Sequence, residues 1–254
     1  MPDHSSPKNP DHSLPKPPDH SSSKPPDHSS PKTPDHPPIK KLLALALLAF
    51  PVLSILGFAL HFHSLHGFFH FKWTRPPYNA EALFNALVSG RGHGFVIAHT
   101  IVYLAVPFLL TCVLVLSWYL FRHYQWMAFV GAFLGTIGCL ALAGVVSTWL
   151  SFAAVSGVHP EQYDGARAAL VELTRIQGML KWNTFCSYGI FAGLIVLATG
   201  LWRSRQFPKM NMLCIIIGSL LFMLFMDMDN WMLTATILLF IGLIPAIKRL
   251  WQPK

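Results

Sequence analysis

Long apolar runs, separated by short polar segments, occupy the chain from residue 42 to its C-terminus. They cover residues 42–62, 94–120, 127–155, 183–202, 211–226 and 231–247. A helix of about 20 residues crosses a hydrocarbon core about 30 Å thick, and in lipid it satisfies its own backbone hydrogen bonds. The pattern predicts an all-α fold, a polytopic transmembrane bundle of about six helices over residues 42–254.

The last two runs, at 211–226 and 231–247, are shorter than the ones before them. Residues 227–230, Asp-Met-Asp-Asn, separate the two runs. This segment predicts a tight hairpin in which Asp and Asn side chains cap the final helix. An alternative arrangement has five spans and makes this pair re-entrant, but we favour six.

Two polar connections are long enough to hold helices of their own. Residues 78–89 begin with Asn79 as a cap and place Phe84 and Leu87 on one side. Residues 161–180 also separate apolar from charged positions at helical spacing. Both patterns predict amphipathic helices that lie on the membrane surface.

Before the first apolar run, residues 2–41 consist of eight-residue repeats, the first of which reads PDHSSPKN. Leu14 and Ile39 are the large aliphatic side chains in this segment. Burial therefore cannot offset the entropy of ordering, and residues 1–41 are predicted to form a disordered tail. We interpret the tail as a solvated spacer or docking arm. Weak metal buffering by its Asp-His pairs, or Cu(II) or Ni(II) bound at an N-terminal Pro-Asp-His, are the alternatives.

Composition supports the membrane class. Hydrophobic residues make up 53% of the chain and charged residues 12%, whereas a soluble domain carries about a quarter charged residues. The four cysteines all fall inside predicted helices and form no C-x-x-C pair, which indicates apolar packing residues.

The net charge of +8 belongs mainly to the membrane part, because residues 1–41 hold six Lys and five Asp and contribute +1. Basic residues concentrate in short segments such as those around Arg122 and Arg203–Lys209. By the positive-inside rule, these segments and both termini are expected in the cytoplasm of a multi-pass protein of the plasma (inner) membrane. Anionic lipid headgroups explain the basic excess, and no nucleic-acid partner is expected.

Glycines at helical spacing mark two helix faces. Gly131, Gly135 and Gly138 share a face of the third run, and Gly189 and Gly193 share a face of the fourth. Small residues let backbones approach closely where lipid supplies no hydrophobic drive, so these glycines are predicted to pack helices together. Their partner is either the other stripe or a second subunit.

Histidines gather where the first run ends and the second begins, on the predicted outer side: His61, His63, His66, His70, His93 and His99. Three interpretations remain open: imidazoles in the wet headgroup zone, a haem or metal site, or contacts to a pigment or quinone. Under the second interpretation, haem b or copper is held by His63, His66 and His99, and a metal by His61, His70 and His93. Two neighbouring antiparallel helices would bring such ligands together.

Residues 200–221 read GLWRSRQFPKMNMLCIIIGSLL, in which a Leu-Trp-Arg-Ser run and a Pro-Lys pair link two late apolar segments. The segment resembles the helix–loop–helix of small, uncharacterised bacterial six-helix integral membrane proteins. The resemblance covers these residues only. It implies a bacterial plasma-membrane protein and carries no active residues with it.

Enzyme signatures such as G-x-x-x-x-G-K-[ST], H-E-x-x-H and G-x-S-x-G do not occur in the sequence. The apolar runs also lack a mid-span charge, which disfavours transport of a charged solute. The pattern favours a non-catalytic accessory or scaffolding subunit of a larger membrane complex, with the bilayer and other membrane subunits as partners. The alternatives are a haem b- or copper-binding redox protein that uses the outer histidines, and a channel or carrier for an uncharged solute.

Overall fold

The structure is a computed structural model that describes residues 37–60, 69, 71, 81, 84, 85, 87, 88, 92–152, 157–175, 178–226 and 228–252. Regular structure in this part of the chain is entirely helical, which confirms the all-α prediction there. The chain divides into two units, Met1–Asp35 and His36–Lys254, and the helices belong to the second. The repeat tail lies outside the described residues.

The apolar helices follow the predicted runs closely: α1 (Pro37–Ala59), α4 (Gly92–Phe121), α5 (Gln125–Phe152), α7 (Gly178–Arg203), α8 (Lys209–Leu224) and α9 (Asp229–Trp251). A 3-10 turn, η3 (Pro160–Gln162), and the helix α6 (Tyr163–Arg175) lie between α5 and α7. The predicted boundary at residue 42 falls inside α1, which begins at Pro37. The last helix is longer than its apolar run, because Asp229 in its first turn and Lys248 and Arg249 in its last turn complement the helix dipole.

Five of these helices are long and apolar enough to cross a membrane: α1, α4, α5, α7 and α9. The exception is α8, which has 16 residues and at about 1.5 Å per residue falls short of a core about 30 Å thick. The described helices therefore define a multi-pass membrane protein. Five long helices are one fewer than the six spans that we favoured from the sequence, because the run at 211–226 forms the short helix α8. The partner of α8 in the predicted re-entrant pair, α9, has 23 residues and is long enough to span by itself.

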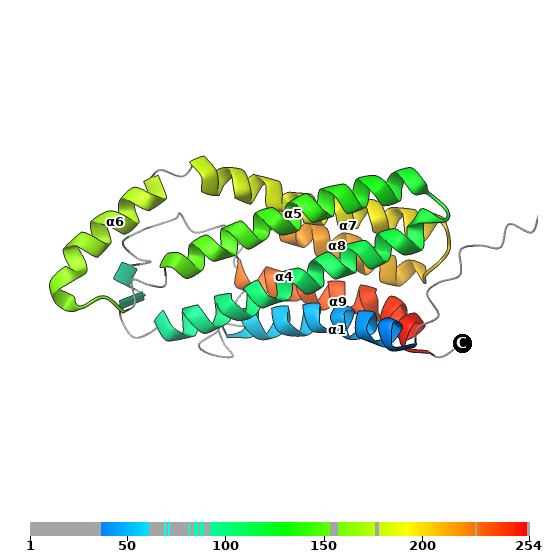
Figure 1. Ribbon diagram of the computed structural model, residues 1–254, viewed down its shortest axis with the longest axis horizontal. Coiled ribbons are helices and arrows are strands. Elements are labelled where there is room, and N and C mark those ends of the chain that lie inside the picture. Colours follow the sequence, from blue (N-terminus) through cyan, green and yellow to red (C-terminus); the bar gives the residue numbers. More distant parts are fainter. Residues whose placement is uncertain are drawn as a thin grey trace, which may run out of the picture. The chain divides into compact units, whose positions relative to one another are not determined.

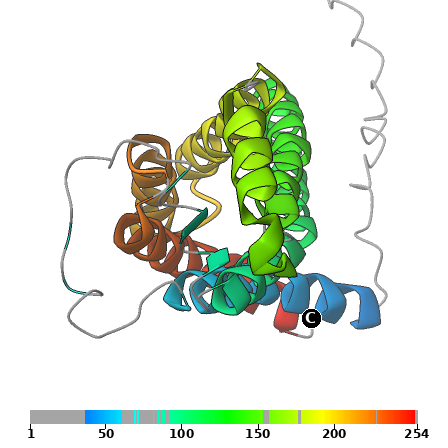
Figure 2. The same cartoon turned by 90° about the vertical axis from the view of Figure 1, so that its left-hand side faces the viewer.

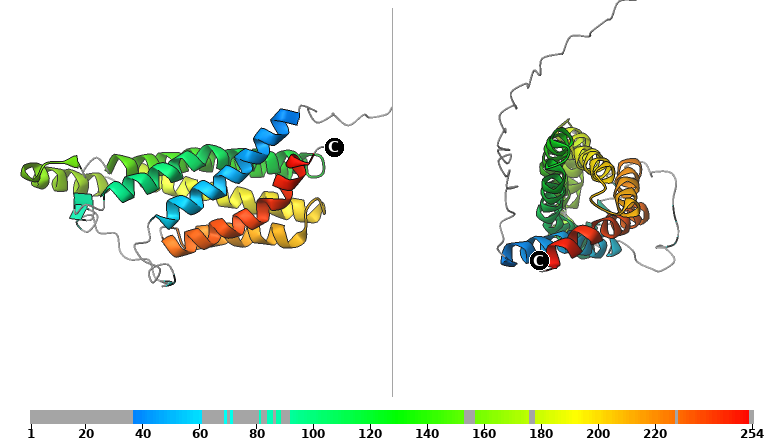
Figure 3. Two further views of the ribbon diagram at one scale, coloured as in Figure 1. Left: turned by 90° about the horizontal axis from the view of Figure 1, so that it is seen from below. Right: turned by 90° about the vertical axis from the view of Figure 1, so that its right-hand side faces the viewer.

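The helices of the second unit are arranged as a ring in which each packs against the next: α1, α4, α5, α7, α8, α9 and back to α1. Successive helices run in alternating directions, and α6 lies at the end where α4 begins and α5 finishes (Figure 1). An additional contact joins α4 to α7 across the ring. Figure 3 shows α1 lying obliquely across α4 and α9, and the end view in Figure 2 shows the order of the helices.

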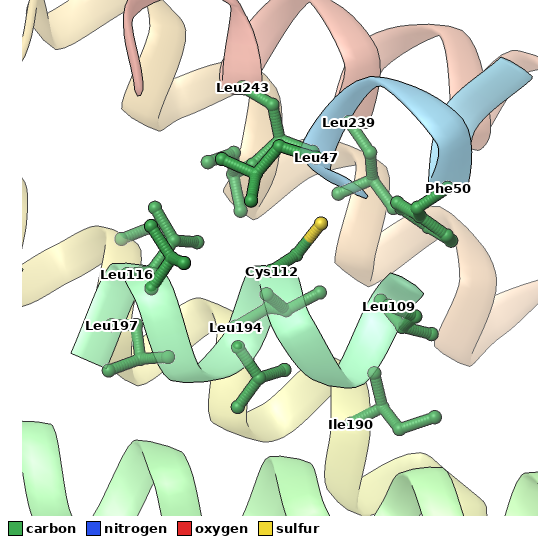
Figure 4. Packing of buried hydrophobic residues seen from close by; sticks show 14 of the residues in the cluster. Leu47, Phe50, Leu109, Cys112, Leu116, Ile190, Leu194, Leu197, Leu239 and Leu243 are labelled. Carbon is green, nitrogen blue, oxygen red and sulfur yellow. The ribbon is translucent and has the colours of Figure 1, made fainter. Parts of the chain in front are cut away.

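Apolar side chains from four helices meet around Cys112 of α4, as Figure 4 shows. Cys112 points toward Leu47 of α1 and Leu239 of α9, whereas Leu194 of α7 lies on the other side of α4. These side chains are at most 2% exposed. This part of the interior is a close-packed core, as the cysteine pattern predicted.

The two predicted glycine stripes meet each other between α5 and α7. A Cβ added to Gly138 would lie 2.2 Å from the backbone nitrogen of Ile190, and one added to Gly193 would lie 2.6 Å from the carbonyl oxygen of Gly131. Gly189 likewise sits against the backbone of α5, with a Cβ position 2.8 Å from the carbonyl oxygen of Leu134. The stripes are therefore used within the chain.

Candidate functional site

Of the predicted ligand histidines, the structure describes His93 and His99, while His61, His63, His66 and His70 lie outside the described residues. His93 is exposed at the start of α4, and His99 is half-buried two turns further along the same helix. The described residues therefore do not test whether these six side chains come together. Within the described residues, no group of three or more His, Cys, Asp or Glu side chains is placed to hold a metal ion.

The imidazole of His99 is fixed by its neighbours. Its Nδ1 lies 2.9 Å from the carbonyl oxygen of Phe95, one turn earlier. Because a carbonyl only accepts, Nδ1 is the donor in this bond, which sets the tautomer of the neutral ring. The ring lies 3.9 Å from that of Phe95 and 6.4 Å from that of Trp149 on α5, centroid to centroid. His99 is thus part of an aromatic contact between α4 and α5.

A second, smaller core lies at this end of the bundle, formed by Phe84, Leu87, Phe152 and Leu170. The apolar side of α6 supplies Leu170 and Tyr163, and the Tyr163 ring meets Phe84 edge-on at 5.6 Å. The sequence predicted that residues 78–89 and 161–180 would each lie on the membrane. In the structure their described apolar faces pack on each other and on α5, because burying two apolar faces together removes more surface from water.

Polar contacts hold the same two segments together. Arg167 of α6 pairs with Glu81 at 3.8 Å, and its guanidinium lies 5.6 Å from the centroid of Phe84. Both charged side chains are largely exposed, so this ion pair adds little stability by itself. It joins α6 to the segment that carries Glu81. This end, with α6 and the small core, is called the α6 end below.

The opposite end carries a network that the sequence analysis did not find. Arg249, near the end of α9, donates from Nη1 to Oε1 of Gln206 at 3.0 Å. The Gln206 amide in turn donates to Nε2 of His123. These residues come from the α4–α5 turn, the α7–α8 turn and α9, so one chain of hydrogen bonds ties three segments together.

Two aromatic rings contact the Arg249 guanidinium of this network. The Arg249 guanidinium lies 5.3 Å from the centroid of Phe207 and 5.6 Å from that of Tyr119. The two rings meet edge-on at 5.2 Å, and Phe207 is buried. The basic and aromatic residues of the turns were the sequence signal for this network. The sequence alone did not show that residues 123, 206 and 249 lie together, because they are far apart in the chain.

Charge is divided between the two ends. The end that carries Arg249, called the basic end, also holds the start of α1 and both helix turns, and its described cations are Lys40, Lys41, Arg122, Arg203, Arg205, Lys209, Lys248 and Arg249. The carboxylates among the described residues all lie at the α6 end: Glu81, Glu161, Asp164, Glu172 and Asp229. The α6 end also carries cations, such as Arg167 and Lys181, so what distinguishes the basic end is that its described charges are all positive.

One face of α5 carries a row of exposed aromatic rings. Trp126, Phe129 and Phe133 are 74%, 61% and 55% exposed. Successive rings stack at 6.4 and 6.2 Å between centroids, with interplanar angles of 28° and 14°. Ile137 and Leu140 continue the same face, opposite the glycines that pack on α7. We call these five residues the α5 outer face.

The chain is thus a multi-pass α-helical membrane protein with a glycine-packed bundle, an α6 end and a basic end. No family model, no curated protein and no solved structure matches it.

Proposed function

We propose that the protein is a non-catalytic accessory or scaffolding subunit of a larger assembly in a bacterial plasma membrane. The observation that carries the proposal is the α5 outer face, with its three stacked and exposed rings. Because the glycine stripe on the other side of α5 is used against α7, this outer face is the surface of α5 that remains for a partner.

A protein partner accounts for the composition of this face better than lipid alone. Flexible aliphatic side chains are sufficient to meet acyl chains, and α8 shows such a surface at Ile217, Leu220 and Leu224. Aromatic rings are enriched at protein interfaces, where each offers a large contact area for little loss of conformational entropy. Stacking between Phe129 and Phe133 further restricts the rings before any partner binds.

Photo-crosslinking in native membranes tests the proposal. A photoreactive phenylalanine analogue replaces Phe133, which is 55% exposed, and the matched control replaces Leu104 of α4, which is 54% exposed. We expect a discrete protein adduct of one mass from position 133 and lipid adducts alone from position 104. Lipid adducts alone from both positions would overturn the proposal.

A second candidate function is a haem b- or copper-binding redox protein, and one observation favours it. Histidines that bind metals usually donate their other ring N–H to a carbonyl or carboxylate, and His99 does so to Phe95. The same bond also forms in histidines that serve only packing. Spectroscopy of the purified protein separates the two candidates, as set out in the Discussion.

A further inference from the structure

The basic end carries the cations of an anion-binding site, and the guanidinium of Arg249 at its centre is already held in place. Arg249 is exposed, yet its guanidinium is held by Gln206 through a hydrogen bond of 3.0 Å and by the rings of Tyr119 and Phe207. A long cationic side chain normally loses rotamer entropy when it binds a ligand. Here the protein fixes much of that side chain beforehand, so less entropy is lost on binding.

The geometry leaves donors for a ligand. A guanidinium has five N–H groups in a planar fork that matches phosphate, and one of them is used on Gln206. Cations adjoin every member of the network along the chain: Arg122 precedes His123, Arg205 precedes Gln206, and Lys248 precedes Arg249. All three are exposed.

Carboxylates that could neutralise this cluster are absent from the described part of the basic end. The side chains of Arg205, Lys248 and Arg249 make no ion pair within the described residues. An anion that binds to these three side chains therefore does not have to displace a carboxylate. Charge complementarity calls for a ligand with one or more phosphate groups.

The depth of the site indicates where the phosphate comes from. Tyr124 and Trp251 are exposed at the same end of the bundle. Exposed Trp and Tyr at helix ends mark the headgroup level of a bilayer. A guanidinium held among them lies at the depth of lipid phosphates, and juxtamembrane cations attract anionic lipids.

We propose that the basic end binds the headgroup of an anionic membrane phospholipid, with Arg249 as the central phosphate contact and Arg122, Arg205 and Lys248 around it. This site is independent of the α5 outer face, and neither requires the other. A soluble phosphate or a nucleic acid offers related charges, and competition with each of them distinguishes these sources.

Native mass spectrometry of the purified full chain, with phosphatidylglycerol or phosphatidylcholine added, tests the site. We expect the wild-type protein to retain phosphatidylglycerol in preference to phosphatidylcholine. Arg249→Gln should weaken retention about five-fold or more, since it removes one cationic contact and the fork geometry. Lys181→Gln, an equal change of charge at the α6 end, is the matched control and should leave retention unchanged.

Arg249 also contacts Gln206, Tyr119 and Phe207, so its loss can disturb the fold. The double variant Arg205→Gln, Lys248→Gln removes only exposed side chains and should weaken retention with an unchanged thermal midpoint. Equal retention of the two lipids, or equal losses in the Lys181 control, would overturn the proposal. So would displacement of bound phosphatidylglycerol by millimolar inorganic phosphate or by a DNA oligonucleotide, because the ligand would then be a soluble anion.

Discussion

Asn211 supplies a hydrogen bond that Pro245 removes from α9. Proline has no backbone N–H, so Pro245 leaves the carbonyl oxygen of Ile241 without its helical donor. The side-chain amide of Asn211 on α8 donates to that oxygen at 2.7 Å. This replacement of a backbone donor by a side-chain donor matters in a membrane protein, because the hydrocarbon core offers no other donor to an unpaired carbonyl. The bond also fixes α8, the shortest apolar helix described, against α9.

We predict that Asn211→Leu lowers the free energy of unfolding by about 1–2 kcal/mol, since it leaves one carbonyl unpaired. The Pro245→Ala background is the control, because alanine restores the backbone donor to Ile241. There Asn211→Leu should cost clearly less. Unfolding in mixed detergent micelles measures both values. Equal costs in the two backgrounds would show that Asn211 acts through packing alone.

His99 distinguishes the two candidate functions. If it ligates haem b or copper with His63 or His66, the purified protein carries a Soret band or stoichiometric copper, and His99→Ala abolishes it. If the protein is a scaffold, the same substitution removes only the bond to Phe95 and the ring contacts. We expect colourless, metal-free protein and a loss of about 1 kcal/mol in stability. Absorption spectroscopy and elemental analysis of wild type and variant decide between the outcomes.

At the scale of the elements, the α5–α7 contact requires glycine where the two helices approach most closely, because there is no room for a Cβ atom. A Cβ on Gly138 meets backbone atoms of α7, which cannot rotate away as a side chain can. We predict that Gly138→Ala destabilises the bundle by about 1–3 kcal/mol through overpacking. Gly94→Ala in α4 is the matched control, because a Cβ there meets nothing within 4 Å.

The control substitution should be neutral or slightly stabilising, since alanine has the higher helix propensity. Thermal unfolding of both variants in one detergent measures the difference. Similar midpoints for the two would mean that α5 and α7 readjust freely, contrary to the close backbone contact described here.

The sequence predicted the elements well and their contacts poorly. Apolar run length placed six helices, of which five are long enough to span, and glycine spacing identified the face of α5 that packs. The sequence did not show which segment packs against each apolar face. Amphipathic periodicity marks Leu170 as buried, but it cannot say whether lipid or Phe84 covers it. Local sequence patterns likewise cannot predict the contact between His123 and Gln206, because these two residues are far apart in the chain.

At the scale of the whole unit, the helix order and the charge distribution have a common consequence. The start of α1, the α4–α5 and α7–α8 turns and the end of α9 share the basic end. The α6 end carries the described carboxylates and a cap of packed apolar residues. Because positive segments near the membrane are retained on the side of synthesis, the basic end is predicted to face the cytoplasm. A cytoplasmic leaflet rich in anionic lipid then meets the cationic cluster around Arg249.

Cysteine labelling of intact cells tests this orientation. Cys186 and Cys214 are half-buried and are first replaced by serine, while Cys112 and Cys139 are buried in the core. Single cysteines are then placed at Glu161, exposed at the α6 end, and at Gln252, exposed after α9. We expect a membrane-impermeant maleimide to label position 161 in intact cells and position 252 only after permeabilisation. Labelling of 252 with protection of 161 would reverse the topology, and it would also place the Arg249 cluster against the leaflet with fewer anionic headgroups.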